Sequence, residues 1–265
     1  MPHPIKRAIA AGAMTLATAS VMAAAPKPTI VLVHGAFAGS SSWNGVVAEL
    51  SQQGYPVIAA ANPLRGVASD GAYVAALARS VNGPVVLVGH SYGGAVISAA
   101  ANGQANVKAL VFVAAFAPDQ GESALALTGK FPGSTLPPAL AVPVKLDDGG
   151  EDLYVQQAKF PLQFAADVPL AQAQAMAATQ RPIKAATLSE AAPVPAWKTI
   201  PSWSIHGTAD LNIPPQAMVF MAERAKARKA VVVEGGSHAL MVSRPREVAA
   251  LIVDAARSVT VDAGR

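Results

Sequence analysis

The chain has 265 residues, of which 52% are hydrophobic and 14% are charged, with a formal net charge of +4 and no cysteine. This hydrophobicity argues against a disordered chain, and the small, scattered charge forms no basic patch of the kind that binds nucleic acid. The lack of cysteine excludes disulfides, thiolate chemistry and a cysteine-linked lipid anchor.

Residues 1–25 have the pattern of an export signal. Lys6 and Arg7 precede an uncharged, alanine-rich stretch that ends in small residues at Ala25. The alternative is a frayed, alanine-rich helix. We expect a signal peptide that is removed during export to a periplasm or to the medium. The stretch is too short for a stable membrane anchor, so we expect no membrane insertion.

From Thr29 onward, strand-like and helix-like segments alternate, which predicts a parallel sheet with crossover helices. Continuous apolar runs predict strands at residues 29–35, 56–60, 85–89, 107–116, 202–207 and 229–235. Amphipathic or small-residue segments predict helices at residues 42–54, 69–81, 93–101, 215–227 and 246–259. The predicted fold is α/β, with a mostly parallel sheet of about six strands and helices on both faces.

The alternation stops at residues 118–200, a segment rich in Pro, Gln and Ala. Here we expect irregular chain and, from Asp152 onward, two or three short helices. Apolar side chains such as Leu153 and Tyr154 need a surface to cover, which favours a lid over a disordered loop. We therefore predict a core formed by residues 26–117 and 201–265, and a small helical cap at residues 118–200.

The segment "GPVVLVGHSYGGAVISAA" predicts a strand, a sharp turn and a helix, with Ser91 at the turn. Gly89 and Gly93 flank this serine because a Cβ at either position would collide with neighbouring backbone. The turn presents Ser91 at the edge of the sheet, at a helix N-terminus that favours negative charge.

A serine hydroxyl is a weak nucleophile, so Ser91 requires a base and an acid that orients the base. Both should follow strands, because ligand sites in parallel sheets lie at the carboxyl ends of strands. His238, in a glycine-rich loop after the last strand, is the predicted base. Asp210 is the favoured acid, since a turn at Gly207 lets it fold back toward His238. Asp119 is the alternative, although it can instead cap the first turn of the cap.

An oxyanion formed at Ser91 requires hydrogen-bond donors. The N–H of Tyr92 follows the serine, and the "HGAFAG" segment after the first strand offers a second donor from Ala36 or Phe37. Each donor contributes about 3 kcal/mol to transition-state stabilisation. We find no metal-ligand spacing, phosphate loop or dinucleotide fingerprint, so we expect no metal and no cofactor.

The segments "HGAFAGSSSW", "GHSYGG", "HGTADLNIP" and "GGSHALMVSRP" together resemble the α/β-hydrolase superfamily. The resemblance is to the branch that holds EstC-like esterases, plant methyl-ester esterases and hydroxynitrile lyases. It implies the α/β-hydrolase fold, a cap inserted after the fourth of these strands, and a cofactor-free serine esterase. The implied partner is a small or medium ester, cleaved through an acyl-enzyme intermediate.

Two positions favour hydrolysis over lyase chemistry. Hydroxynitrile lyases of this branch carry threonine where this chain has Gly35, and lysine where it has Ala239. The alternatives are an amide or lactone hydrolase, a perhydrolase, lyase-like C–C cleavage, and a receptor that binds a small ligand without catalysis. Apolar residues that we expect in the pocket, or equally in the core, are Phe37, Trp43, Phe116, Phe160, Phe164 and Leu240.

Overall fold

The computed structural model describes residues 1, 3 and 26–262, and the predicted signal peptide lies outside these residues except for positions 1 and 3. The core is a six-stranded parallel sheet in the order β2-β1-β3-β4-β8-β9. Its strands are β1 (Thr29–Val33), β2 (Val57–Ala60), β3 (Val85–His90), β4 (Val107–Val113), β8 (Ser202–Gly207) and β9 (Lys229–Val233). The predicted fold class is confirmed.

Burial explains why these sequence runs form strands. Every residue of β3 and β8 is buried, whereas the edge strands β2 and β9 are partly exposed. Strands covered by helices on both faces are expected to be continuously apolar, and "VVLV" in β3 has this character. Because all six strands are parallel, their carboxyl ends meet at one edge of the sheet.

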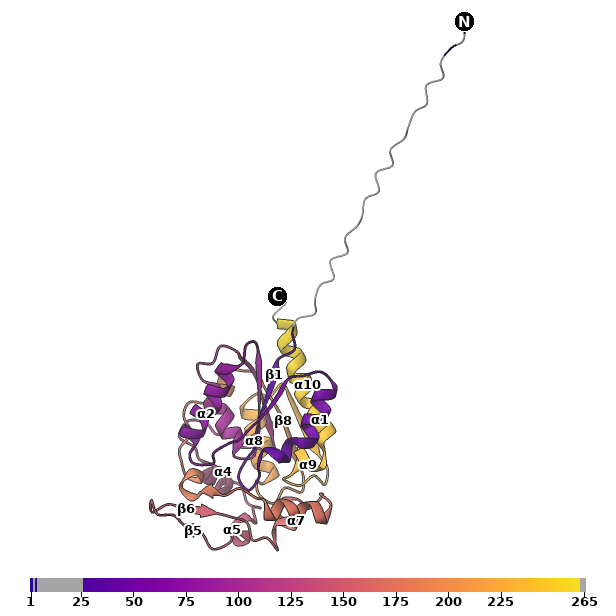
Figure 1. The fold of residues 1–265 in the computed structure, drawn as a ribbon. Coiled ribbons are helices and arrows are strands. Elements are labelled where there is room, and N and C mark those ends of the chain that lie inside the picture. The colour runs from indigo at the N-terminus through magenta and orange to yellow at the C-terminus, as the bar shows by residue number, and fades with distance from the viewer. Residues whose placement is uncertain (2, 4–25, 263–265) are drawn as a thin grey trace.

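Helices cover both faces of the sheet (Figure 1). On one face α1 (Asn44–Gln52) packs against α10 (Pro245–Asp262), and on the other α2 (Val67–Ser80) packs against α3 (Gly93–Ala100). The remaining core helices are a 3-10 turn before α1 (Ser40–Trp43), α8 (Pro215–Arg224) beside β8, and α9 (Leu240–Ser243) before α10. The short helix α9 was not expected from the sequence, because its four residues are too few to show a period.

Residues between β4 and β8 form short elements at the end of the molecule opposite the chain termini (Figure 1). The helices are α4 (Ala124–Lys130), α5 (Leu136–Ala139), α6 (Phe160–Phe164) and α7 (Leu170–Ala178), with 3-10 turns at Ala185–Leu188 and Ala196–Lys198. The strands β5 (Val144–Lys145), β6 (Glu151–Leu153) and β7 (Ile183–Lys184) form an antiparallel sheet. We refer to residues 118–200 as the cap.

The two or three short helices expected in the stretch from Asp152 correspond to α6, α7 and the 3-10 turn at Ala185–Leu188. The start of this stretch is a strand instead, because Asp152 lies in β6, between Val144 of β5 and Lys184 of β7. The pairing partners come from different parts of the cap, so the strand follows from contacts distant in sequence and leaves no local periodic signal.

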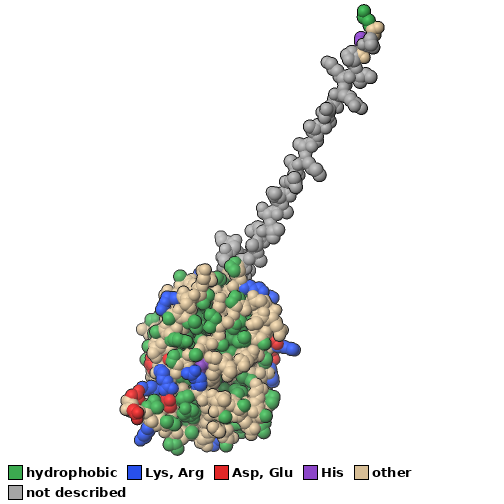
Figure 2. All heavy atoms as spheres, in the orientation of Figure 1, with side chains coloured by type: hydrophobic (Ala, Val, Ile, Leu, Met, Phe, Trp, Pro, Cys, Tyr) green, Lys and Arg blue, Asp and Glu red, His purple; other side chains and the backbone are tan. Residues whose placement is uncertain are grey.

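The surface of the described chain carries few charged side chains on the face shown in Figure 2. They gather at its lower left, where Figure 1 places β5 and β6. Asp148, between β5 and β6, forms an ion pair with Lys184 of β7 at 2.8 Å. Within residues 26–262 we find no helical segment with the length and apolar character that crossing a bilayer requires.

Candidate active site

Ser91 occupies a strained turn between β3 and α3. Its φ is +53°, a left-handed conformation that costs a non-glycine residue free energy. The flanking glycines allow the turn: a Cβ on Gly89 would lie 2.5 Å from the carbonyl oxygen of Gly93, and one on Gly93 would run into the carbonyl oxygen of Val33. The glycine requirement predicted from the sequence is therefore met by close backbone contacts on both sides.

The backbone around Ser91 is tied to the adjacent strand. The Ser91 N–H donates to the carbonyl of Val113 at 3.2 Å, and the Ser91 carbonyl accepts from the Phe116 N–H at 3.1 Å. On the other side, a Cβ on Gly35 would lie 2.6 Å from the Cβ of Ser91, so the loop after β1 passes directly beside the serine. This loop is the segment that we expected to supply an oxyanion donor.

Two backbone N–H groups beside Ser91 are available to a ligand. The Phe37 N–H is not one of them, because it donates to the carbonyl of Arg181 in the cap at 3.0 Å. Among the described residues, the N–H groups of Ala36 and Tyr92 have no hydrogen-bond acceptor. Of the two sequence-based choices for the donor from the first loop, the geometry thus favours Ala36.

His238 and Asp210 form a buried pair. Nδ1 of His238 lies 2.7 Å from Oδ2 of Asp210, and both side chains are at most 2% exposed. The other carboxylate oxygen accepts from the backbone N–H of Asn212 at 2.8 Å and of Ile213 at 2.9 Å. These bonds fix the carboxylate and leave Nε2 as the free ring nitrogen of His238.

The alternative acid lies elsewhere. Asp119 is at the start of the cap, where its carboxylate pairs with the ammonium group of Lys198 at 2.5 Å. The hydrogen bond from Lys198 lowers the pKa of Asp119. Its side chain is 31% exposed, in contrast to the buried carboxylate of Asp210.

The Asp210 and His238 loops meet at a point where there is no room for a side chain. A Cβ on Gly207, the last residue of β8, would run into the backbone of Gly236. The two loops are also joined by bonds from the Thr208 N–H to the Val233 carbonyl and from the Ala209 N–H to the Gly236 carbonyl, both 3.0 Å long. This close contact explains how residues far apart in sequence reach hydrogen-bonding distance.

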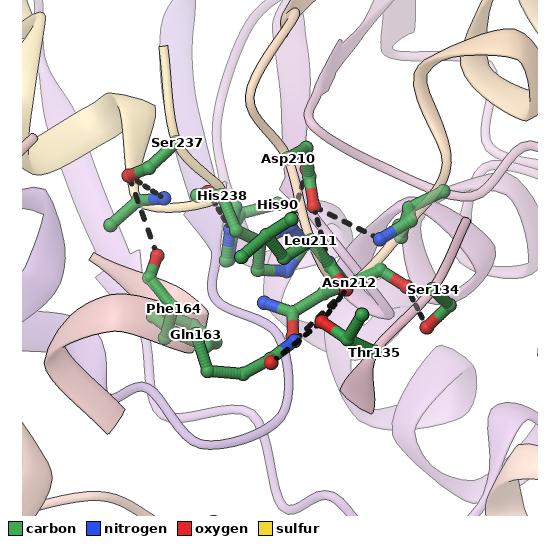
Figure 3. Close-up of polar contacts among 12 residues, drawn as sticks. His90, Ser134, Thr135, Gln163, Phe164, Asp210, Leu211, Asn212, Ser237 and His238 are labelled. Carbon is green, nitrogen blue, oxygen red and sulfur yellow. Dashed lines mark hydrogen bonds and ion pairs between the residues drawn. The ribbon is translucent and has the colours of Figure 1, made fainter. Parts of the chain in front are cut away.

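The cap holds the Asp210 loop from the other side (Figure 3). Gln163 donates from Nε2 to the Leu211 carbonyl and to Oδ1 of Asn212, both at 2.9 Å. The Ser134 hydroxyl donates to the Asn212 carbonyl at 2.8 Å, and the Thr135 N–H donates to the Leu211 carbonyl at 3.0 Å. The cap thereby holds the loop whose N–H groups fix the carboxylate.

Aromatic and imidazole rings pack behind His238. The His90 ring centroid lies 4.7 Å from that of His238, and the Phe164 ring meets the imidazole edge-on at 4.9 Å. Burial lowers the pKa of His90 well below its ordinary value, so His90 is neutral and donates from Nε2 to the His238 carbonyl at 3.0 Å. These contacts restrain both the backbone and the ring of His238.

A cavity of about 310 Å³ connects these groups. Its wall includes the predicted residues Ser91, His238, Ala36, Tyr92, Phe37 and Phe116. Asp210 lies behind His238 and does not reach this wall. Residues that the sequence did not indicate as pocket-lining are Ala124, Leu125, Thr128, Ser134, Leu136, Pro137, Leu140, Leu153, Ala185, Leu188, Ser189, Asn212 and Ile213. Most belong to the cap, and most of the wall is apolar.

Four residues expected in the pocket lie outside its wall. Phe160 stacks on Phe164 at 4.8 Å, which in turn covers His238, and Trp43 lies edge-on to the ring of His90 at 6.4 Å. Leu240 is fully buried in the core. Apolar residues beside a sheet can pack in the core or face a ligand, and the sequence does not distinguish the two. These four side chains pack in the core, behind the site.

Comparison with known proteins gives the family of the chain. An alignment of 124 residues with a carbendazim-hydrolyzing esterase from Nocardioides sp. (strain SG-4G) is 33% identical and covers 42% of this chain and 50% of that protein. Polyneuridine aldehyde esterase superposes with a TM-score of 0.74 at 20% identity, covering 86% of this chain and 98% of that one. An extracellular α/β-hydrolase from a Paenibacillus species gives 0.68 at 25% identity, covering 87% and 99%.

These similarities agree with a match along most of the chain. The family model described as the alpha/beta hydrolase family matches residues 30–251, which include all the strands of the core sheet except the first residue of β1. The resemblance predicted from the sequence motifs is confirmed. The chain belongs to the alpha/beta hydrolase family.

Proposed function

We propose that the chain is a serine carboxylic-ester hydrolase that acts on small to medium esters with an apolar acyl or alcohol group. One observation carries the proposal: Ser91, His238 and the Ala36 and Tyr92 residues line one largely apolar cavity, with His238 anchored to Asp210 at 2.7 Å. A nucleophile, a base and oxyanion donors around one cavity are the parts that acyl transfer requires.

In the proposed reaction, Oγ of Ser91 forms a bond to the ester carbonyl carbon while Nε2 of His238 accepts the hydroxyl proton. The Asp210 carboxylate holds the imidazole by Nδ1 and stabilises its charged form. The negative oxygen of the tetrahedral intermediate accepts hydrogen bonds from the N–H groups of Ala36 and Tyr92. The C–O bond then breaks, and the alcohol leaves with the proton from His238.

The acyl-enzyme is hydrolysed by the same groups. Water attacks the acyl carbon as His238 takes its proton, the intermediate collapses, and the proton returns to Ser91 as the carboxylic acid is released. A cavity of about 310 Å³ suits a compact ester. Relatives named as esterases support this reaction class.

Lyase chemistry has less support. The residue after His238 is Ala239, which is fully buried and carries no charge to stabilise a leaving anion. At Gly35 a larger side chain would collide with Ser91, so this chain offers no side chain beside the serine at that point.

The test is hydrolysis of p-nitrophenyl acetate, butyrate and octanoate by the purified protein and by Ser91→Ala. We expect turnover of at least one ester, and a loss of about 10³-fold or more in kcat for Ser91→Ala. Parallel assays with lactones, anilides, a cyanohydrin, and acetate with hydrogen peroxide distinguish the alternatives. Binding of these esters without turnover would overturn the proposal in favour of a receptor.

A further inference from the structure

A buried carboxylate lies near the site, outside the groups that carry the proposed reaction. Asp70 is in the first turn of α2, and its side chain is fully buried. Its oxygens accept from the Arg65 backbone N–H at 3.2 and 3.1 Å, and Oδ2 also accepts from the Tyr92 hydroxyl at 2.9 Å. Burial of a carboxylate is unfavourable unless such donors surround it. Neither Asp70 nor the Tyr92 hydroxyl has a role in the mechanism above.

Tyr92 links this carboxylate to the oxyanion hole. Its N–H is one of the two free donors beside Ser91, and its ring, only 1% exposed, carries the hydroxyl that binds Asp70. Burial, and then the charge of Asp70, raises the pKa of Tyr92, so the hydroxyl stays protonated and continues to donate. Because Tyr92 follows the strained Ser91, a rotation of the peptide that joins them would turn the N–H away from the oxyanion.

The N-terminal end of α2 is a rigid support, since the cap binds the first turn of the helix and also Arg65, just before it. The Glu190 carboxylate accepts from the N–H groups of Val67 at 2.8 Å and Ala68 at 2.9 Å. The Arg65 guanidinium binds both carboxylate oxygens of Asp152 in β6, at 2.5 and 3.2 Å. The segment that carries Asp70 is therefore held by these contacts with the cap.

We propose that Asp70 is a positioning residue that holds the Tyr92 hydroxyl and thereby directs the Tyr92 N–H toward the oxyanion. The proposal rests on the esterase function proposed above, and Asp70 itself touches no substrate. A displaced N–H stabilises the transition state less, whereas binding of the ground state depends mainly on the apolar cavity wall. Loss of the Asp70–Tyr92 bond should consequently lower kcat and leave KM nearly unchanged.

The test uses Tyr92→Phe, Asp70→Asn and the double variant, with Ser69→Ala as the matched control. Tyr92→Phe keeps the backbone N–H and removes only the hydroxyl, so we expect kcat to fall about tenfold with KM within about twofold. Asp70→Asn keeps a weaker bond and should lose less. The double variant should lose no more than Tyr92→Phe alone, because the same bond is already absent. Ser69→Ala removes a hydroxyl that donates to Asp70 at 3.4 Å and leaves the Asp70–Tyr92 bond in place, so it should retain kcat.

A trifluoromethyl ketone that forms a tetrahedral adduct with Ser91 provides a second measurement. Its affinity should fall by the same factor as kcat in Tyr92→Phe and in Asp70→Asn, whereas a purely structural role would lower Tm and leave this affinity unchanged. Unchanged kcat and affinity in either variant, or losses that multiply in the double variant, would overturn the positioning role alone. Wild-type protein with no Ser91-dependent hydrolysis would overturn it together with the esterase function.

Discussion

The core and the cap contribute different parts of the candidate site. The core supplies Ser91, Asp210 and His238, each just after a strand of the six-stranded sheet. The cap supplies more than half of the residues around the cavity, from the short helices α4 and α5, the strand β6, the 3-10 turn at Ala185–Leu188 and residues beside them. Parallel strands hold residues that must be placed accurately, whereas short elements shape a pocket with fewer constraints on sequence.

The cap also restrains the core loops. Gln163 and Ser134 bind the Asp210 loop, and the carbonyl of Arg181 occupies the Phe37 N–H. The last contact decides which residue of the first loop is free to donate to an oxyanion. The cap thus takes part in positioning the core groups, and the variants below separate this contribution from the shape of the pocket.

The largest effect on kcat is expected from a change at the core carboxylate of Asp210, and almost none from the same change at the cap carboxylate of Asp119. Asp210→Asn should lower kcat for p-nitrophenyl esters by about 10³-fold or more, because an amide neither stabilises the imidazolium nor fixes the correct tautomer of His238. Asp119→Asn, at the cap surface, should stay within about twofold of wild type, because its partner Lys198 is exposed. A greater loss in Asp119→Asn than in Asp210→Asn would reverse the assignment. Circular dichroism of both variants checks that each is folded.

The sequence predicted the core well because its signals are local. The run "VVLV" marks β3, the two glycines around Ser91 mark the turn, and the position of His238 after the last strand places it at the same edge. With the strands parallel, the rule that sites lie at their carboxyl ends limited the acid to Asp210 or Asp119, and the turn at Gly207 favoured Asp210. The structure adds the physical detail, such as the Gly207 contact that lets the two loops meet.

The sequence predicted short helices in the cap but not its strands, because the strands depend on partners distant in the chain. The strand at Glu151–Leu153 pairs with residues on both sides of it in sequence, and neither neighbour is longer than two residues. The same holds for polar contacts: nothing in the pattern around Tyr92 indicates that its hydroxyl binds Asp70, 22 positions earlier. Phe160 and Phe164 show that apolar character alone does not separate a pocket wall from its support.

An effect of intermediate size is expected on stability at acidic pH. The pH dependence of the free energy of unfolding should come from buried histidines of the core. Burial lowers the pKa of His34 to about 4 and also lowers the pKa values of His90 and His206, and the cap contains no histidine. Below pH 6.5 the unfolded chain binds protons that the folded core does not, so acidification favours unfolding. Stability is fully present above pH 6.5 and falls toward pH 4, with His34 alone contributing a loss of about 3 kcal/mol.

Urea unfolding at pH values between 7.5 and 5 measures this dependence. Each buried histidine adds a slope of up to about 1.4 kcal/mol per pH unit, and His206→Gln should remove one such contribution. The comparison is between slopes, so a lower absolute stability of the variant does not affect it. An equal slope in the two proteins would show that His206 binds its proton as readily in the folded core as in the unfolded chain.

The smallest expected effect lies in the cap and concerns substrate choice. Leu125 in α4 lines the cavity although 60% exposed, whereas Leu162 in α6 is 72% exposed and does not line it. Leu125→Ala should raise KM for p-nitrophenyl octanoate about threefold through lost apolar contact, with little change for the acetate. Leu162→Ala, which removes the same atoms from the cap surface, should leave both KM values unchanged.

The kcat for p-nitrophenyl acetate shows whether Leu125 only shapes the pocket or also helps to hold the reacting groups of the core. If the cap only shapes the pocket at this point, Leu125→Ala retains the acetate kcat, because the reacting groups belong to the core. A fall in that kcat would mean that α4 helps to hold the reacting groups, as Gln163 and Ser134 hold the Asp210 loop. The separation between a core that carries the reacting groups and a cap that shapes the pocket would then not hold at α4.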